Sequence, residues 1–411
     1  MSAREGRRIE VNGRGIDDRT PLLPHNHDER FRRRRGDLPM WRHVLYHKMT
    51  WAWYNTVVAT GSISLILYDL PYRVHRLWVL GSIVYIASLI LFVFTFAVHL
   101  LRFMIKPSLI PRSMKHPDEG NHVSSLAAAM GVLILNGVTY SEKIHGYNPN
   151  AMRTFFWIFI VLSTVFGIMQ PLIQFGKPIQ EHRVRRDFTP AGMTPVIPLL
   201  LAGPVAAGVL AHLEPKLHHT ALGIFAFGVA LQGMGIFLSL LYSANILERL
   251  HREGFPPSHE RPGLFLASIP PALTSWAFSS LAAQAVRHFP PNGGAPGGNP
   301  DFVVGGVALS YVGVAASLLF WGLAVWWFFV AALANLGQIL NLGSDVLEGF
   351  MVVFAHAAMF LANNQLLRIF EWPKALTVTN EVLGVATVVV WGILVVGCMI
   401  GLVTGRLLED D

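Results

Sequence analysis

The stretch "TWAWYNTVVATGSISLILYDLPY", residues 50–72, decides the fold, because it joins the apolar length of a membrane-spanning helix to a small polar break. It is nearly free of charge, opens with an aromatic cluster, is interrupted at Thr60-Gly61-Ser62 and closes on Pro71. About 20 apolar residues are enough for a helix to cross the hydrocarbon core of a bilayer. The stretch therefore predicts a transmembrane helix with hydroxyl groups at mid-depth.

The rest of the chain has the same character. Apolar residues make up 53% of the 411 positions and charged residues only 14%, which excludes an ordinary soluble enzyme. Short turns between successive apolar runs favour helical hairpins. We predict an all-α polytopic membrane protein of ten transmembrane helices in five helical hairpins. The runs are 50–68, 76–103, 122–140, 152–175, 194–212, 219–246, 262–286, 302–333, 350–366 and 376–404.

Charge predicts the domain limits and the orientation. Residues 1–48 read as a disordered basic tail, 49–405 as the membrane transport domain and 406–411 as a short C-terminal segment. Lys and Arg cluster on the side of the N-terminus, so both termini are expected in the cytoplasm. Basic runs beside a membrane attract anionic lipid. No aromatic interleaving accompanies them, so a nucleic-acid partner is not expected.

The odd-numbered and even-numbered runs differ. Even runs are dense in large apolar residues, whereas odd runs are interrupted by Gly, Pro, Thr, Ser or Asn, as in "MTPVIPLLLAGPVAAG" at 193–208. Such residues free backbone groups that hydrocarbon does not tolerate unless protein or a water-filled cavity satisfies them. Odd helices are thus predicted to line a pathway, although small polar residues also allow close helix packing without a pore.

The polar residues of these runs favour an anion as the solute. Carboxylates are nearly missing from the spans, so a ring of Asp or Glu for a cation is not expected. Broken-helix N-termini and neutral donors would suit an anion instead. The predicted pathway residues are Thr60, Ser62, Asn136, Thr194 and Thr274.

Three ionisable residues are further candidates. His356 lies within the ninth run, where a His either carries a proton beside the anion or is a neutral imidazole bonded to backbone. Arg73 and Arg261 lie at opposite mouths, where they could capture a dianion through charge-assisted hydrogen bonds. Ordinary topology signals explain the two arginines equally well.

Other classes of protein fit less well. The cluster "HLEPKLHH" at 212–219 could suggest a membrane metalloenzyme, but no second cluster completes a di-metal pattern. A receptor would need a binding module outside the bilayer, and the short loops offer none. We therefore expect no enzyme activity, no cofactor and no metal site.

The chain resembles the tellurite-resistance/dicarboxylate transporter family, and most closely its fungal malic acid transporter branch. The first span, "LIPRSMKHPDEGNHVSS" before the third, "ERLHREGFPPSHERPGLFLASIPPALTS" into the seventh and "LFWGLAVWWFFVAAL" in the eighth carry the resemblance. This family also includes sulfite exporters and plant guard-cell anion channels. The resemblance implies transport of C4-dicarboxylates such as malate, with protons as a possible co-substrate and sulfite or small inorganic anions as the alternative. It further implies a homotrimer in the plasma membrane, with one central pathway per subunit.

The family resemblance also implies a phenylalanine that plugs the pathway from the ninth helix, in a motif similar to Trp-Trp-Ala-x-x-Phe-Pro-Asn. Here the stretch reads "GFMVVFAHAAMFLANN", 349–364, without the tryptophan pair. A gap-free comparison places Phe354 at the plug position, with Ala355 and His356 where Pro and Asn usually stand. Phe360 is the second candidate for the gate.

Overall fold

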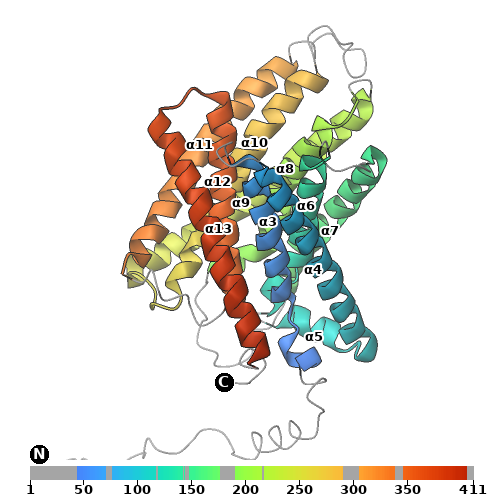
Figure 1. Ribbon diagram of the computed structural model, residues 1–411, viewed down its shortest axis with the longest axis vertical. Helices are drawn as coiled ribbons and strands as arrows, with labels where there is room; N and C mark the ends of the chain where they lie inside the picture. Colours follow the sequence, from blue (N-terminus) through green and yellow to red (C-terminus); the bar gives the residue numbers. More distant parts are fainter. Residues whose placement is uncertain are drawn as a thin grey trace, which may run out of the picture.

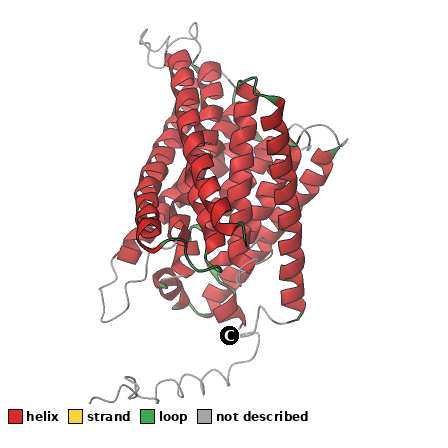
Figure 2. Ribbon diagram, turned by 90° about the vertical axis from the view of Figure 1, so that its left-hand side faces the viewer, coloured by secondary structure: helices red, strands yellow, loops and turns green. Residues whose placement is uncertain are grey.

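The computed structural model is helical, with no strand in the part of the chain that it describes (Figure 2). Most of the expected tail, residues 1–43, lies outside the described residues, as do Arg73 and the expected C-terminal segment 406–411. The described residues are 44–70, 76–116, 119–141, 143, 148–175, 190–214, 217–289, 305–337 and 346–404.

Five helices form the inside of the molecule and make a closed ring, here called the inner ring (Figure 1). Each packs against two others of the five, in the order α3, α6, α8, α10, α12 and back to α3. They are the predicted odd-numbered spans. Their bounds are α3 (Tyr54–Asp69), α6 (Ser125–Thr139), α8 (Ile197–Ala211), α10 (Ile269–His288) and α12 (Val346–Ile369).

Five longer helices surround this ring, and each packs on the inner helix that precedes it, as predicted for helical hairpins. Large apolar side chains on them are exposed, such as Phe237 and Leu319. In a bilayer, such side chains face lipid. The outer helices are α4 (Leu77–Ile105), α7 (Pro149–Phe175), α9 (His218–Glu253), α11 (Gly305–Asn335) and α13 (Lys374–Val403).

Burial confirms the predicted difference between the two sets of helices. In the most apolar part of the span 190–211, which contains α8, 94% of the residues are buried, against 17% in α4. All residues of α3 from Tyr54 to Leu67 are buried as well. The runs interrupted by Gly, Pro and small polar residues are therefore the inner ones.

Short 3₁₀ turns precede four of the inner helices: η2 (Trp51–Trp53), η3 (Glu119–His122), η4 (Pro190–Val196) and η5 (Arg261–Ser268). Pro195 lies within η4, and a proline stands near the start of η5, α8 and α10. Proline has no N–H to donate, so it is tolerated where a helix begins and its first donors are free. These turns lie next to one another in the fold.

The number of membrane spans stays a prediction, as do the domain limits. Among the described residues, nine helices are long and apolar enough to cross a membrane, and the ninth predicted run, within α12, is one of them. The first predicted span corresponds to α3, which has 16 residues. At about 1.5 Å per residue it is about 24 Å long, shorter than the roughly 30 Å of the hydrocarbon core.

Candidate functional site

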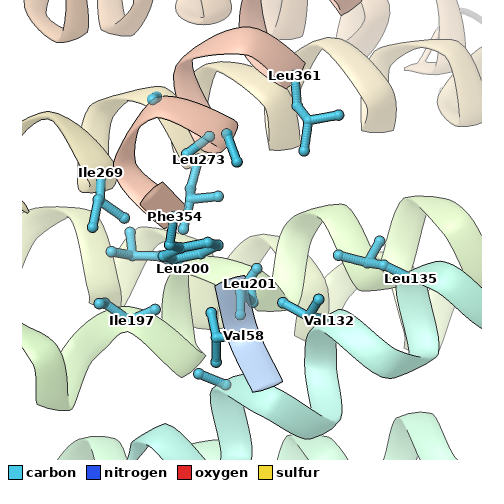
Figure 3. Packing of buried hydrophobic residues seen from close by; sticks show 14 of the residues in the cluster. Val58, Val132, Leu135, Ile197, Leu200, Leu201, Ile269, Leu273, Phe354 and Leu361 are labelled. Atoms are coloured by element: carbon cyan, nitrogen blue, oxygen red, sulfur yellow. The ribbon is translucent and has the colours of Figure 1, made fainter. Parts of the chain in front are cut away.

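Phe354 lies at the centre of the inner ring and is only 2% exposed (Figure 3). Apolar side chains from the other four inner helices surround its position, and all belong to one buried cluster. They include Val58 of α3, Val132 of α6, Leu200 of α8, and Ile269 and Leu273 of α10. An ion cannot pass through such packing unless these side chains move, so the structure is that of a closed centre.

Phe360, the second predicted gate residue, is also buried but lies elsewhere on α12. A Cβ added at Gly384 of α13 would come within 2.7 Å of the Phe360 ring. Phe360 therefore packs between α12 and α13. Of the two phenylalanines, Phe354 is the one that Figure 3 places among the other inner helices.

All five inner helices begin at the same end of the molecule, here called the N-terminal end of the inner ring. Two contacts join their starts: the Asn55 amide nitrogen lies 3.3 Å from Nδ1 of His122, and the Ser124 hydroxyl donates to the Thr194 carbonyl oxygen at 3.0 Å. Each helix start carries a partial positive charge from its free N–H groups. This end is therefore favourable for an anion.

At the opposite end, the last residues of the inner helices meet. Asp69, the last residue of α3, pairs with Arg368 of α12 at 2.7 Å, and Nε2 of His288 in α10 lies 2.8 Å from the carbonyl oxygen of Leu210 in α8. Arg287 donates to the carbonyl oxygen of Ala211. Arg287 and His288 thus satisfy backbone carbonyl groups at the end of α8, which carry the partial negative charge of a helix C-terminus.

Tyr140, directly after α6, belongs to the same end. Its hydroxyl donates to the Ser64 carbonyl oxygen at 2.9 Å and so joins α6 to α3.

The polar break in the first span serves a helix contact. Gly61 has no side chain, and a Cβ there would come within 2.6 Å of Val132. The space lets the Asn136 amide donate to the carbonyl oxygens of Gly61 and Val132, both at 2.9 Å. The carbonyl oxygen of the Asn136 side chain is buried and has no partner.

Three of the predicted pathway hydroxyls are bound by protein groups. Thr60 accepts from the indole of Trp391 at 3.2 Å, and Ser62 donates to the Val58 carbonyl oxygen at 2.7 Å. Thr274 donates to a backbone oxygen of its own helix and accepts from Gln232 of α9 at 2.8 Å. The contacts of these three residues are those expected if small polar residues serve close helix packing and not the lining of a pathway.

His356 lies on a different side of α12 from Phe354, because residues two apart on an α-helix are about 200° apart around its axis. Its ring packs against Phe265 of η5 and Phe328 of α11, with centroids 4.5 and 5.1 Å away. Nδ1 is 2.8 Å from the Val352 carbonyl oxygen and donates to it. The observed contacts are those of an imidazole bonded to backbone.

Arg261 opens η5 and links it to α11. Its guanidinium donates to the carbonyl oxygens of Pro256 at 2.9 Å and Ala334 at 3.4 Å. Both partners are neutral, so its positive charge persists at the N-terminal end of the inner ring.

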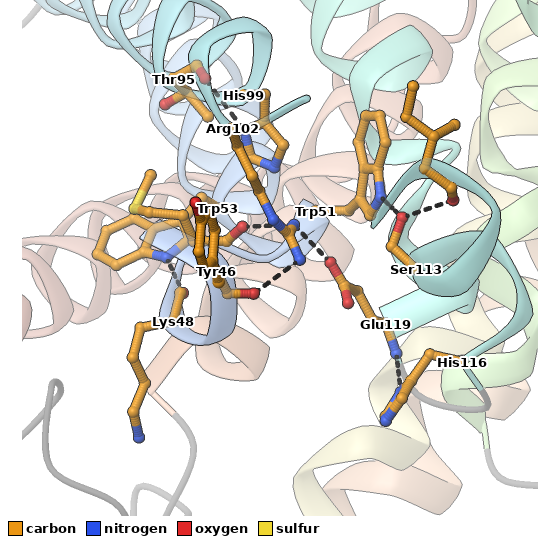
Figure 4. Close-up of polar contacts among 12 residues, drawn as sticks. Tyr46, Lys48, Trp51, Trp53, Thr95, His99, Arg102, Ser113, His116 and Glu119 are labelled. Carbon is orange, nitrogen blue, oxygen red and sulfur yellow. Dashed lines mark hydrogen bonds and ion pairs between the residues drawn. The ribbon is translucent and has the colours of Figure 1, made fainter. Parts of the chain in front are cut away.

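A buried ion pair at that end was not predicted (Figure 4). Arg102 of α4 is 2% exposed and binds Glu119 of η3 at 2.7 Å. It also donates to the carbonyl oxygens of Met49 and Tyr46, which precede α3. The Arg102 guanidinium therefore joins the outer helix α4 to the segments that precede α3 and α6.

Comparison with known proteins matches residues 48–399 to the SLAC1 family, described as voltage-dependent anion channel. The chain belongs to this family.

Two relatives come from Schizosaccharomyces pombe. A malic acid transport protein is 28% identical over 297 residues, which cover 70% of this chain and 63% of that protein. A putative malic acid transport protein is 25% identical over 354 residues, covering 84% of this chain and 78% of that protein. The matched part is thus under two thirds of the first relative's length.

Proposed function

We propose that this SLAC1-family protein moves C4-dicarboxylates such as malate across the plasma membrane. The shared N-terminal end of the inner helices carries the proposal, because it places five partial positive charges around one axis. These charges attract monoanions and dianions, and they attract a dianion more strongly. The names of the two yeast relatives support malate as the solute.

The proposed route begins at the N-terminal end of the inner ring and passes Phe354. Arg261, and Arg73 on the other side, draw the anion toward the two mouths. Within the ring, Thr194 keeps a buried hydroxyl without a partner and is the proposed lining donor. The Asn136 amide nitrogen already donates to two backbone oxygens, so Asn136 would line the route only after these bonds rearrange. Phe354 closes the route, and movement of its ring opens it.

The surroundings of His356 support a structural role. Two aromatic rings and a backbone oxygen occupy its sides, and none of these groups is a proton donor or acceptor that titrates. Coupling to protons would then have to use another group or the anion itself.

We further propose that both termini are cytoplasmic, so that the anion is loaded from the cytoplasm, and that the protein is a homotrimer in contact with anionic lipid. The basic residues on the side of the N-terminus support the orientation. The exposed apolar faces of the outer helices are available for contacts between subunits as well as for lipid. Protease protection of tagged termini tests the orientation, and the mass of the detergent-solubilised complex tests the trimer.

The substrate is tested by uptake of labelled malate into proteoliposomes, with and without an inward proton gradient. Currents carried by sulfite and chloride are recorded in parallel. Saturable malate uptake is the expected result, and stimulation by the gradient would establish coupling to protons. Currents of sulfite or chloride without malate uptake would overturn malate in favour of the alternative, a small inorganic anion.

A further inference from the structure

Two serine and threonine hydroxyls of the inner ring and its preceding turns differ from the other serines and threonines there; the Tyr54 phenol of α3 is likewise buried without a partner. Within the described residues, every other buried Ser or Thr hydroxyl of the inner helices and of the turns that precede them has a hydrogen-bond partner. The hydroxyls of Ser125 and Thr194 are buried and have none. Each residue is only 1% exposed.

These two residues belong to adjacent segments. Ser125 is the first residue of α6, and Thr194 lies in η4, directly before α8. The Ser124 hydroxyl, next to Ser125, donates to the carbonyl oxygen of Thr194 at 3.0 Å and fixes the two segments side by side. Both hydroxyls therefore lie at the N-terminal end of the inner ring, one at the start of α6 and one in the turn before α8.

A buried hydroxyl without a partner lowers the stability of a fold, so its presence needs a reason. A ligand that accepts two hydrogen bonds would satisfy both hydroxyls. A carboxylate has two acceptor oxygens, and the free N–H groups and partial positive charge at the start of α6 add to its attraction.

We infer that the Ser125 and Thr194 hydroxyls form a binding subsite for one carboxylate of the transported dicarboxylate, at the end where the anion is loaded. This inference rests on the proposed function and specifies where the substrate first binds. The anion then reaches Phe354 from this subsite.

The two donors of the proposed subsite are neutral hydroxyls, which suits transport. Arg102, the buried cation nearby in the fold, is already paired with Glu119 and two carbonyl oxygens. Neutral donors bind a carboxylate without holding it as an ion pair would. An ion in a pathway must bind well enough to enter and weakly enough to leave.

The test uses the purified full-length protein with Ser125→Ala, Thr194→Val and the double variant. Thermal unfolding is measured with and without malate, and malate uptake gives KM and kcat. We expect the double variant to unfold at the same or a higher temperature than wild type without malate, because no bond is lost. The stabilisation by malate should disappear and KM should rise about tenfold, with a smaller change in kcat.

Matched variants separate this role from a structural one. Thr194→Ser and Ser125→Thr keep a hydroxyl and should keep the stabilisation by malate. Ser163→Ala removes an equally buried hydroxyl without a partner on the outer helix α7, and should leave KM unchanged. A double variant with wild-type KM and wild-type stabilisation by malate would overturn the subsite.

The subsite and the proposed function can fail separately. If wild type transports malate and the double variant does so with unchanged KM, only the subsite is wrong. If wild type does not transport malate, the proposed substrate is wrong, and the same variants are measured with sulfite. Loss of stabilisation by sulfite in the double variant would then support an oxyanion subsite, and its retention would overturn it.

Discussion

Replacing Phe354 with alanine should raise anion flux, because this ring fills the centre of the closed inner ring. Phe354 is 2% exposed and is surrounded by apolar side chains from the other four inner helices. An alanine leaves a gap that the backbones of five packed helices cannot close. The closed arrangement therefore loses stability relative to an open one, in which the Phe354 ring has moved away from these contacts.

The size of the effect follows from the packing that is lost. Truncation of a buried Phe to Ala typically costs about 3–5 kcal/mol. Since about 1.4 kcal/mol corresponds to a tenfold change in an equilibrium, the ratio of open to closed protein should rise by roughly two to three and a half orders of magnitude. Phe354→Leu, which keeps part of the volume, should give a smaller increase.

The assay is anion efflux from proteoliposomes, normalised to the amount of folded protein measured by size-exclusion chromatography. Phe360→Ala is the matched control, since Phe360 is equally buried but packs toward Gly384 of α13. It should lower stability and leave flux per folded molecule unchanged. Wild-type flux in Phe354→Ala, or an equal rise in Phe360→Ala, would refute the assignment of the gate.

The remaining predictions concern stability. Arg102→Ala leaves the Glu119 carboxylate without its partner in a largely buried position and should lower the stability by about 3–5 kcal/mol. Asp69→Asn breaks a pair with Arg368 that is exposed on the arginine side, and should lower the stability by at most about 1 kcal/mol. Equal shifts of the unfolding temperature in these two variants would contradict the difference in burial. Gly61→Ala places a Cβ 2.6 Å from the facing valine side chain and should cost about 1–3 kcal/mol. Truncating that valine to alanine should restore much of the lost stability, and no change in Gly61→Ala would contradict the close contact.

The division into inner and outer helices could be predicted from the sequence because it depends on composition alone. A helix enclosed by protein tolerates Pro, Gly and Ser, whereas a helix in lipid must satisfy its own backbone and present apolar side chains. The run that contains "ATGS" at 59–62 is accordingly the inner helix α3. The stretch "MTPVIPLLLAGPVAAG" at 193–208 forms the turn η4 and the inner helix α8 that follows it.

The direction of each side chain could not be predicted in the same way. A polar residue on an inner helix can point to the axis, to a neighbouring inner helix or to an outer helix, and composition does not distinguish these positions. Thr60 and Thr274 bind partners on the outer helices α13 and α9. His356, two residues from Phe354, contacts η5 and α11. Which side of an inner helix faces the axis depends on how all five inner helices pack together.

The Arg102 pair was missed although a signal for it exists. In the long apolar helix α4, the buried residues recur at helical spacing and include Ser88, Thr95, His99 and Arg102. Such a stripe predicts one protein-facing side on a helix whose other sides face lipid. In the sequence, Arg102 counts only among the basic residues that indicate the orientation in the membrane. Its partner Glu119 lies in the short turn η3, which no hydrophobic periodicity predicts.

The opposite directions of the two sets of helices have an electrical consequence. Five inner helices run one way and five longer outer helices run the other, so the outer dipoles oppose the inner ones over the whole domain, while the starts of the inner helices face the axis together. These dipoles are fixed in the fold, so a voltage across the membrane acts on whatever charge moves along the axis. The permeating ion itself carries the charge that the voltage moves, at about 2.3 kcal/mol per elementary charge for each 100 mV. The steepness of flux against voltage should accordingly follow the valence of the anion, with a dianion responding about twice as steeply as chloride.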